Sequence, residues 1–237
     1  MVNADRLEAG QMQPSEKLTE VYNRLVQAYG IPDWHPDGDP LGGLIATILS
    51  QHTSDVNSER AYRQLIAAFP TWEAVRDAPT PLVAEAIRPG GLANLKAQRI
   101  QQVLRVLTER LRGQPLSLVG LEAMDLDAAT TYLRTLPGVG PKTAACVLLF
   151  SLGRPAFPVD THVWRVTRRV GLIGLRVTAD AAHEALRRAV PAEWRHTLHV
   201  DLIRLGREVC HAQRPAHDAC PLRPVCDYYW RSIGARE

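Results

Sequence analysis

The sequence predicts an all-α fold, and three observations lead to this prediction. Apolar residues recur at helical spacing along almost the whole chain. No segment shows the persuasive alternation of polar and apolar residues that marks a half-buried strand. The connections between helical segments are short, which favours one compact helical fold over separate domains on flexible linkers.

The expected helices follow the apolar pattern from the N-terminus to the cysteine-rich tail. In chain order they cover 15–29, 41–52, 55–69, 79–87, 93–112, 125–136, 141–152, 160–171, 178–189 and 193–209. Proline and glycine mark the turns, because proline cannot continue a helix and glycine adopts conformations that other residues resist. These turn signals are IPDWHPDGDP (31–40), RPGG (88–91), RGQP (112–115) and LGRPAFP (152–158).

Length and composition are those of a soluble globular protein. The 237 residues are enough for one large or two small domains, with 46% hydrophobic and 22% charged residues. The longest apolar stretch, LGGLIATIL (41–49), is too short to span a membrane. The N-terminal residues are polar and contain no apolar signal core, so we expect a cytoplasmic protein.

The basic residues are almost all arginine. Only three of the 28 are lysines, namely Lys17, Lys96 and Lys142. Genomic base composition explains most of such a bias. Arginine stays protonated and cannot act as an amine nucleophile. Lys142, which lies just after a glycine turn, is therefore a candidate for amine chemistry. The net charge of +3 is too small for a general nucleic-acid-binding surface.

LPGVGPKTA (136–144) lies between two predicted helices. It is not a phosphate-binding P-loop, because Pro141 separates Gly140 from Lys142 and a helix precedes it. Gly138 and Gly140 leave the turn open and free its amides to face an anion, and Pro141 suits the start of the next helix. An ordinary helical turn capped by glycine would also contain such residues. The motif favours a helix-hairpin-helix that grips DNA phosphates without reading sequence.

Two residues near this turn could carry chemistry. Lys142 lies in the first turn of a helix, where the dipole disfavours a cation but favours a neutral, attacking amine. A lysine that contacts phosphate as a plain charge would also fit this position. Asp160 precedes a helical pattern, so it is either an N-cap or a carboxylate that supports proton transfer and stabilises positive charge on a sugar.

The stretch LPGVGPKTAACVLLFSLGRPAFPVDTHVWRV (136–166) resembles the signature of the endonuclease III family of DNA glycosylases. The resemblance extends from ILSQHTSD (48–55) to the last cysteine. It implies that Lys142 is the nucleophile and Asp160 its partner. It also implies base excision repair of double-stranded DNA: removal of oxidised pyrimidines, followed by cleavage at the abasic site through a lysine Schiff base.

The C-terminal cysteines depart from the family pattern at one position. Three of the four cysteines fall in the last 28 residues, and in a reducing cytoplasm such a cluster more often binds metal than forms disulfides. The family's 4Fe–4S motif is C-x6-C-x2-C-x5-C, which this chain matches only with His217 beside Cys210, Cys220 and Cys226. Asp218 or water is the next candidate for the fourth iron; the same residues could instead hold zinc on a Cys3His set, or no metal. Cys146, in an apolar helix, is expected in the core.

The resemblance also implies the DNA contacts. Leu92, in GLANLKAQRI (91–100), matches an apolar wedge, unless it packs inward at a helix start. Gln51 and His52 lie where the family has a glutamine plug that fills the space of a flipped nucleotide. The aligned plug position is His52, so this chain departs from the family's glutamine at that position. The expected DNA-binding residues are Gln51, His52, Leu92, Leu136, Gly138, Val139, Gly140, Arg165 and Arg214, although an arginine run such as 165–169 is by default a solvated helix face.

By resemblance, the fold is two helical lobes with a DNA-binding cleft between them. Residues 33–153 form a six-helix barrel with the hairpin, and residues 1–32 and 154–237 form the iron–sulfur domain. We expect a monomer at the nucleoid. Two rival hypotheses are a non-catalytic DNA-binding or iron–sulfur redox-sensing protein, and a lyase that acts only on abasic sites.

Overall fold

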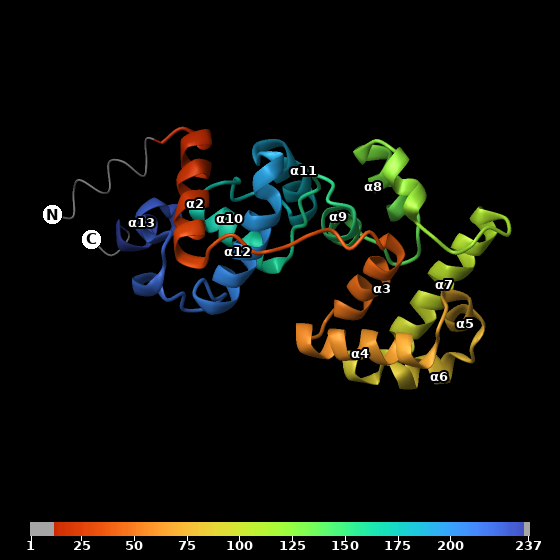
Figure 1. Ribbon diagram of the computed structural model, residues 1–237. Coiled ribbons are helices and arrows are strands. Elements are labelled where there is room, and N and C mark those ends of the chain that lie inside the picture. The colour runs from red at the N-terminus through yellow and green to blue at the C-terminus, as the bar shows by residue number, and fades with distance from the viewer. Residues whose placement is uncertain (1–11, 235–237) are drawn as a thin grey trace. The chain divides into compact units, whose positions relative to one another are not determined.

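The computed structural model describes residues 12–234, and all regular secondary structure among them is helical (Figure 1). The predicted all-α fold is therefore confirmed. None of the helices in this range is long and apolar enough to cross a membrane. Residues 1–11 and 235–237, which the sequence assigned to the iron–sulfur domain, lie outside the described residues.

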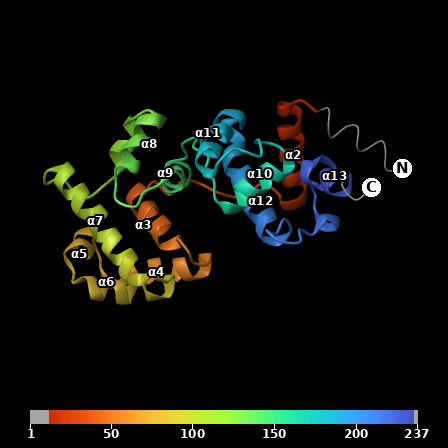
Figure 2. The same cartoon turned by 180° about the vertical axis from the view of Figure 1, so that it is seen from behind.

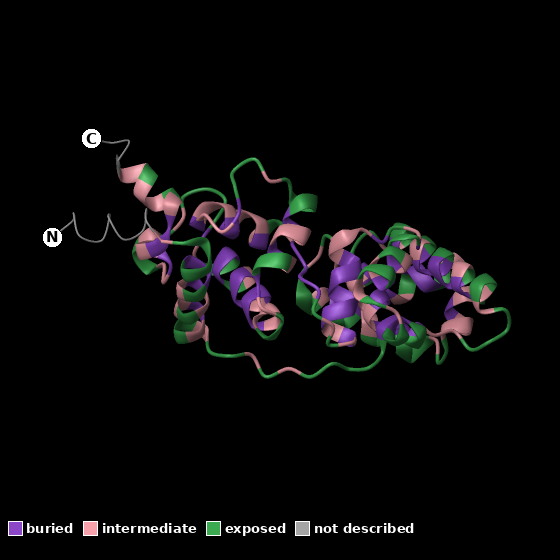
Figure 3. Cartoon of the chain, turned by 90° about the horizontal axis from the view of Figure 1, so that it is seen from above, coloured by how far each residue is buried: buried purple, intermediate pink, exposed green. Residues whose placement is uncertain are grey.

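The chain divides into two compact units. The first, here called the hairpin unit, is the continuous segment His35–Arg154. The second, here called the terminal unit, combines Met1–Trp34 with Pro155–Glu237. Each unit has its own hydrophobic interior, and buried residues line the inward faces of the helices within each (Figure 3).

The hairpin unit is built from short helices joined by tight turns, seen from two sides in Figures 1 and 2. Several begin at a side-chain cap: Asp39, Ser54, Thr71 and Asp125 each accept a hydrogen bond from the amide three residues on. In chain order the elements are α3 (Pro40–Ser50), α4 (Asp55–Ala68), α5 (Trp72–Asp77), α6 (Thr80–Ala86), the 3-10 turn η1 (Arg88–Gly90), α7 (Ala93–Leu111), the 3-10 turn η2 (Val119–Ala123), α8 (Leu126–Arg134), α9 (Pro141–Cys146) and the π-helical turn η3 (Val147–Ser151).

α3 is the central helix of the hairpin unit. Its apolar residues Leu44, Ile45, Ile48 and Leu49 are fully buried. Gly43 lets it approach η3 closely, because a Cβ there would lie 2.0 Å from the Ser151 hydroxyl. This close approach fixes α9, which runs directly into η3, against the core.

The terminal unit packs helices from both ends of the chain. Its elements are α2 (Pro14–Tyr29), α10 (Thr161–Val170), α11 (Ala179–Ala189), the 3-10 turn η4 (Ala192–Trp194), α12 (Arg195–Glu208), the 3-10 turns η5 (His217–Ala219) and η6 (Arg223–Val225), and α13 (Asp227–Gly234). α10 presents a buried valine face to α12. Lys17 of α2 forms an ion pair with Asp227 of α13, which joins the two ends of the described chain.

Two helices were not predicted. α5 has six residues, too few to display a helical period, and it depends on its Thr71 cap. α13 follows the cysteine motif and has only eight residues, which are also too few to display a helical period. The predicted helix 141–152 is also not regular, because it becomes a π-turn from Val147 onward.

Candidate functional site

A helix-hairpin-helix forms at the predicted place. α8 ends at Arg134, and α9 begins at Pro141. Between them Gly138 has φ +71°, a left-handed conformation that favours glycine. The turn is closed by the Val139 amide, which donates to the Leu136 carbonyl at 3.2 Å.

The hairpin turn exposes backbone rather than side chains. Leu136 and Val139 are 2% and 6% exposed, so their side chains belong to the core. These two residues can therefore offer DNA only backbone groups. The amides of Gly138 and Gly140 have no hydrogen-bond partner in the described part of the chain, which leaves them available to an anion.

The three lysines differ sharply in their surroundings. Lys17 is buried in its ion pair with Asp227. Lys96 is 2% exposed and donates to the carbonyls of Leu49 at 2.6 Å and Gly90 at 2.7 Å. Lys142, in the first turn of α9, is half-buried and makes no side-chain hydrogen bond or ion pair with the residues described. Within residues 12–234, only Lys142 is thus free of a structural role.

Asp160 caps α10. Its Oδ1 accepts a hydrogen bond from the Val163 amide at 2.8 Å, so the aspartate is an N-cap. The cap uses one carboxylate oxygen and leaves Oδ2 without a hydrogen bond in the described chain. Lys142 belongs to the hairpin unit and Asp160 to the terminal unit.

The two predicted DNA-reaching loops share an unusual backbone feature. His52 has φ 54° and Leu92 has φ 49°, left-handed conformations that are uncommon outside glycine. Leu92 is 54% exposed, so it does not pack inward. Gln51 is half-buried, whereas its neighbour His52 is exposed.

Sequence reasoning missed the residues that hold these loops. Lys96 binds the last part of α3 at Leu49 and the end of η1 at Gly90, just ahead of each loop. Burial lowers the pKa of Lys96. One turn later on α7, Arg99 Nη1 donates to Gln51 Oε1 at 2.9 Å. No local pattern marks either residue, because their partners lie up to 48 positions away.

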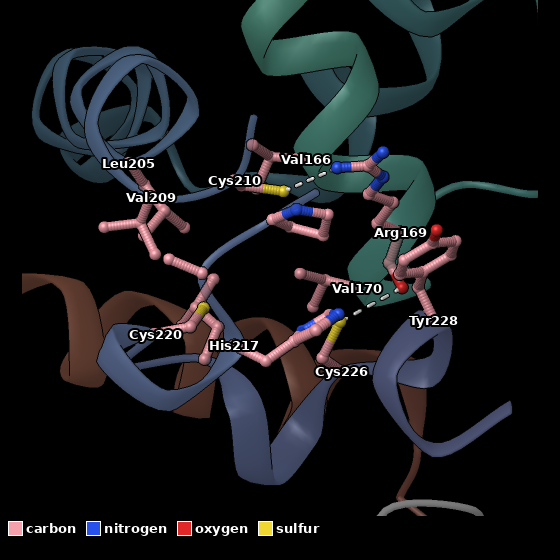
Figure 4. Close-up of a pocket in the computed structure, with 13 residues that line it drawn as sticks. Val166, Arg169, Val170, Leu205, Val209, Cys210, His217, Cys220, Cys226 and Tyr228 are labelled. Atoms are coloured by element: carbon pink, nitrogen blue, oxygen red, sulfur yellow. Dashed lines mark hydrogen bonds between the residues drawn. The ribbon is translucent and has the colours of Figure 1, made fainter. Parts of the chain in front are cut away.

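The three C-terminal cysteines and His217 line one cavity, part of which is open to solvent (Figure 4). Cys210 accepts a hydrogen bond from Arg169 Nη1 at 3.3 Å, and Cys226 lies 3.5 Å from the Arg169 carbonyl. Burial raises the pKa of the Cys220 thiol to about 11 and raises that of Cys226. The predicted ligand set therefore faces a single apolar pocket.

The geometry of the cavity bears on what it can hold. No three His, Cys, Asp or Glu side chains within residues 12–234 converge closely enough to bind a single ion. A tetrahedral zinc needs its ligands within about 2.3 Å of one point. The four side chains line one cavity without converging on a single point. Asp218 is fully exposed and pairs with Arg223, so it does not line this cavity, and Cys146 is buried in the hairpin unit as expected.

The arginines of α10 serve internal contacts. Arg165 donates to the carbonyls of Cys210 at 2.9 Å and Gly206 at 2.8 Å, so part of its guanidinium is used within the terminal unit. Arg169 donates to the His211 and Ala212 carbonyls and stacks over Tyr228 at 4.7 Å. Both side chains thereby fix the start of the cysteine loop. Arg214, with φ 51°, is exposed on that loop.

Comparisons with known proteins agree with this arrangement. Residues 45–192 match the model of the HhH-GPD superfamily of base excision DNA repair proteins. Endonuclease III of Thermotoga maritima is 33% identical over 90% of this chain and 94% of its own length. Endonuclease III of Escherichia coli K12 is 34% identical over 80% of this chain and 84% of its own. A solved trapped endonuclease III–DNA covalent intermediate, an estranged-adenine complex, has a TM-score of 0.76 at 28% identity and covers 94% of this chain and 100% of that one.

Proposed function

Because the chain belongs to the endonuclease III family of HhH-GPD base excision DNA repair proteins, and is thus a DNA glycosylase/AP lyase, we propose that it acts through a lysine Schiff base. The substrates we propose are oxidised pyrimidines and abasic sites in double-stranded DNA. One observation carries the proposal: Lys142 is the only lysine without a structural partner among the described residues, and it follows a turn with free amides.

The proposed reaction proceeds in two stages. Asp160 supports deprotonation of Lys142, and the amine attacks the anomeric carbon of the sugar. The new nitrogen–carbon bond forms as the bond to the damaged base breaks, and the base leaves with the electron pair and gains a proton. Opening of the sugar ring gives the Schiff base. Removal of a proton from the neighbouring carbon then expels the 3′ phosphate, which cuts the strand.

Lys142 belongs to the hairpin unit and Asp160 to the terminal unit, so the proposed reaction uses one residue from each unit. The hairpin unit would act as the barrel domain that grips phosphate through the Gly138 and Gly140 amides. Leu92 would enter the duplex as the wedge, and His52 or Gln51 would occupy the space of the flipped nucleotide. Arg214 would contact phosphate from the terminal unit. We further expect a monomer that works at the nucleoid.

We propose that Cys210, His217, Cys220 and Cys226 hold a 4Fe–4S cluster with a structural role. When bound, the cluster fixes the loop between its ligands by iron–sulfur bonds, and a histidine ligand shifts its reduction potential. The support is the chemistry of the donor set and the single cavity that these four side chains line. Arg165 and Arg169 hold the first part of the same loop through its carbonyls.

The test compares the native protein with Lys142→Ala and Lys142→Arg on duplexes that contain thymine glycol or an abasic site. We expect native protein to release thymine glycol and cut both duplexes, and to form a covalent complex with borohydride. Both variants should bind DNA and form no complex, because arginine keeps the charge but not the nucleophile. If the native protein cuts only the abasic duplex, it is a lyase that acts on abasic sites and has no glycosylase activity. Binding without any trapping by the native protein would favour a non-catalytic DNA-binding protein.

A further inference from the structure

The first turns of α7 hold the loop that follows α3. Lys96 anchors the Leu49 carbonyl, and Arg99 binds the side chain of Gln51 two residues later. Arginine only donates hydrogen bonds, so the atom of Gln51 that faces Arg99 must be the amide oxygen. The orientation of the Gln51 amide is thereby fixed.

Arg99 also packs against the hairpin turn. A Cβ at Gly138 would lie 2.3 Å from Arg99 Nε and 2.4 Å from its Cδ. Real Cβ atoms essentially never approach this closely, so a larger residue at this position would displace the side chain of Arg99. Gly138 thus suits both its φ of +71° and the close approach of Arg99.

The other end of Gln51 reaches α9. Its Nε2 lies 3.4 Å from the hydroxyl of Thr143, a 5% exposed residue next to Lys142. The guanidinium, the amide and the hydroxyl form one chain from α7 to the helix that carries Lys142. Both ends of the Gln51 amide are occupied within this chain, whereas exposed His52 beside it is not part of it.

We propose that Arg99 is a positioning residue for Lys142. It fastens Gln51 to the hairpin turn and, through Thr143, holds the first turn of α9 in register with the phosphate-binding amides. The chain acts on the lysine through protein contacts, since each of its groups binds another residue of the hairpin unit. This inference rests on the proposed lysine chemistry, because it assigns no role to Arg99 if Lys142 does not react.

Loss of the Arg99 contact should affect the rate of Schiff-base formation rather than the affinity for DNA. Misplacement of a reacting group by about 1 Å costs up to about a hundredfold in rate. Loss of the Arg99 bond should therefore slow Schiff-base formation, while the amides of Gly138 and Gly140 still bind phosphate.

The experiment measures single-turnover trapping by borohydride at saturating abasic DNA, together with the DNA dissociation constant. The variants are Arg99→Ala, Gln51→Leu, the double variant and Arg99→Lys, with exposed Arg105→Ala on the same helix as the matched control. Gln51→Leu breaks the same bond from the loop side and leaves the packing of α7 intact, in case Arg99→Ala folds poorly.

We expect Arg99→Ala and Gln51→Leu each to slow trapping at saturating DNA by about tenfold, and the DNA affinity of Arg99→Ala to change by less than about threefold. The double variant should be no slower than the slower single variant, since both remove one interaction. Arg99→Lys should recover part of the rate, and Arg105→Ala should match native protein. Native rates in the single variants, or multiplied effects in the double variant, overturn the inference. Absence of trapping in the native protein would instead overturn the proposed lysine chemistry and this inference with it.

Discussion

His217 and Asp218 are neighbours in the chain, yet only His217 lines the cavity that contains the three C-terminal cysteines. The side chain of Asp218 is fully exposed and accepts a hydrogen bond from Arg223 at 3.2 Å. His217 instead packs near Tyr229, with ring centroids 5.0 Å apart. Of the two residues that spacing offers as a fourth ligand, the fold turns only the histidine toward the cysteines.

His217→Ala should therefore lose most of its iron and its iron–sulfur visible absorption, whereas Asp218→Ala should keep both. His217→Cys restores the all-cysteine ligand set and should retain the cluster. Iron and sulfide content per chain, measured on protein purified without oxygen, checks the prediction. Equal iron in His217→Ala and native protein would assign the fourth position to another group.

Substitutions at Asp160 can separate its role as the N-cap of α10 from its proposed role in catalysis. Asparagine caps a helix about as well as aspartate, so Asp160→Asn should keep the bond to the Val163 amide and leave stability nearly unchanged. Asp160→Ala should cost about 1 kcal/mol of unfolding free energy through the lost cap. Both variants should trap abasic DNA far more slowly than native protein. A native trapping rate in Asp160→Asn would mean that Asp160 is only a cap.

Lys96→Met tests the anchor beneath the two loops. The change leaves the carbonyls of Leu49 and Gly90 without their donor, and each bond to a charged group contributes about 1.5–3 kcal/mol. We expect the unfolding free energy to fall by roughly 3 kcal/mol in denaturant titrations. The folded variant should still be trapped by borohydride at Lys142. Loss of less than about 1 kcal/mol would show that the burial cost of the ammonium cancels both bonds.

Stability should depend on pH through Asp201 of α12. This carboxylate is 2% exposed, its Oδ2 has no partner among the described residues, and burial raises its pKa from 3.8 to about 6. Between those two values the folded state binds more protons than the unfolded state. Stability from this residue therefore increases as pH falls from about 6 toward 4, and the penalty above pH 6 is roughly 3 kcal/mol.

Asp201→Asn should remove this dependence and flatten the curve of unfolding free energy against pH. Denaturant titrations at several pH values between about 4 and 7.5 provide the comparison. Asp180→Asn, an exposed change on α11, serves as the control and should leave the native curve unaltered. An unchanged slope in Asp201→Asn would contradict the raised pKa.

Local patterns explain what could be predicted from the sequence. Apolar periodicity indicated the longer helices, and a glycine pair beside a proline identified the hairpin, because these features depend on residues within one or two turns. α5 and α13 were not predicted, because a helix of six or eight residues has too few positions to show a helical period.

Contacts between distant residues could not be predicted in this way. The hydrogen bonds of Arg165 with carbonyls more than 40 residues later in the chain are one example. Lys96 and Arg99 have the pattern of ordinary polar residues in an amphipathic helix, although they hold the loops beside the hairpin. Spacing alone could not choose between His217 and Asp218, because the choice depends on which way η5 turns its side chains.

Locating the covalent bond between protein and DNA tests the proposed chemistry of Lys142 most directly. Protein reduced with borohydride on abasic DNA is digested with nuclease and protease, and the modified peptide is sequenced by mass spectrometry. We expect the sugar remnant on Lys142, because Lys17 and Lys96 are buried in structural contacts. A remnant on another lysine or on the N-terminal amine, with Lys142 unmodified, would contradict this expectation.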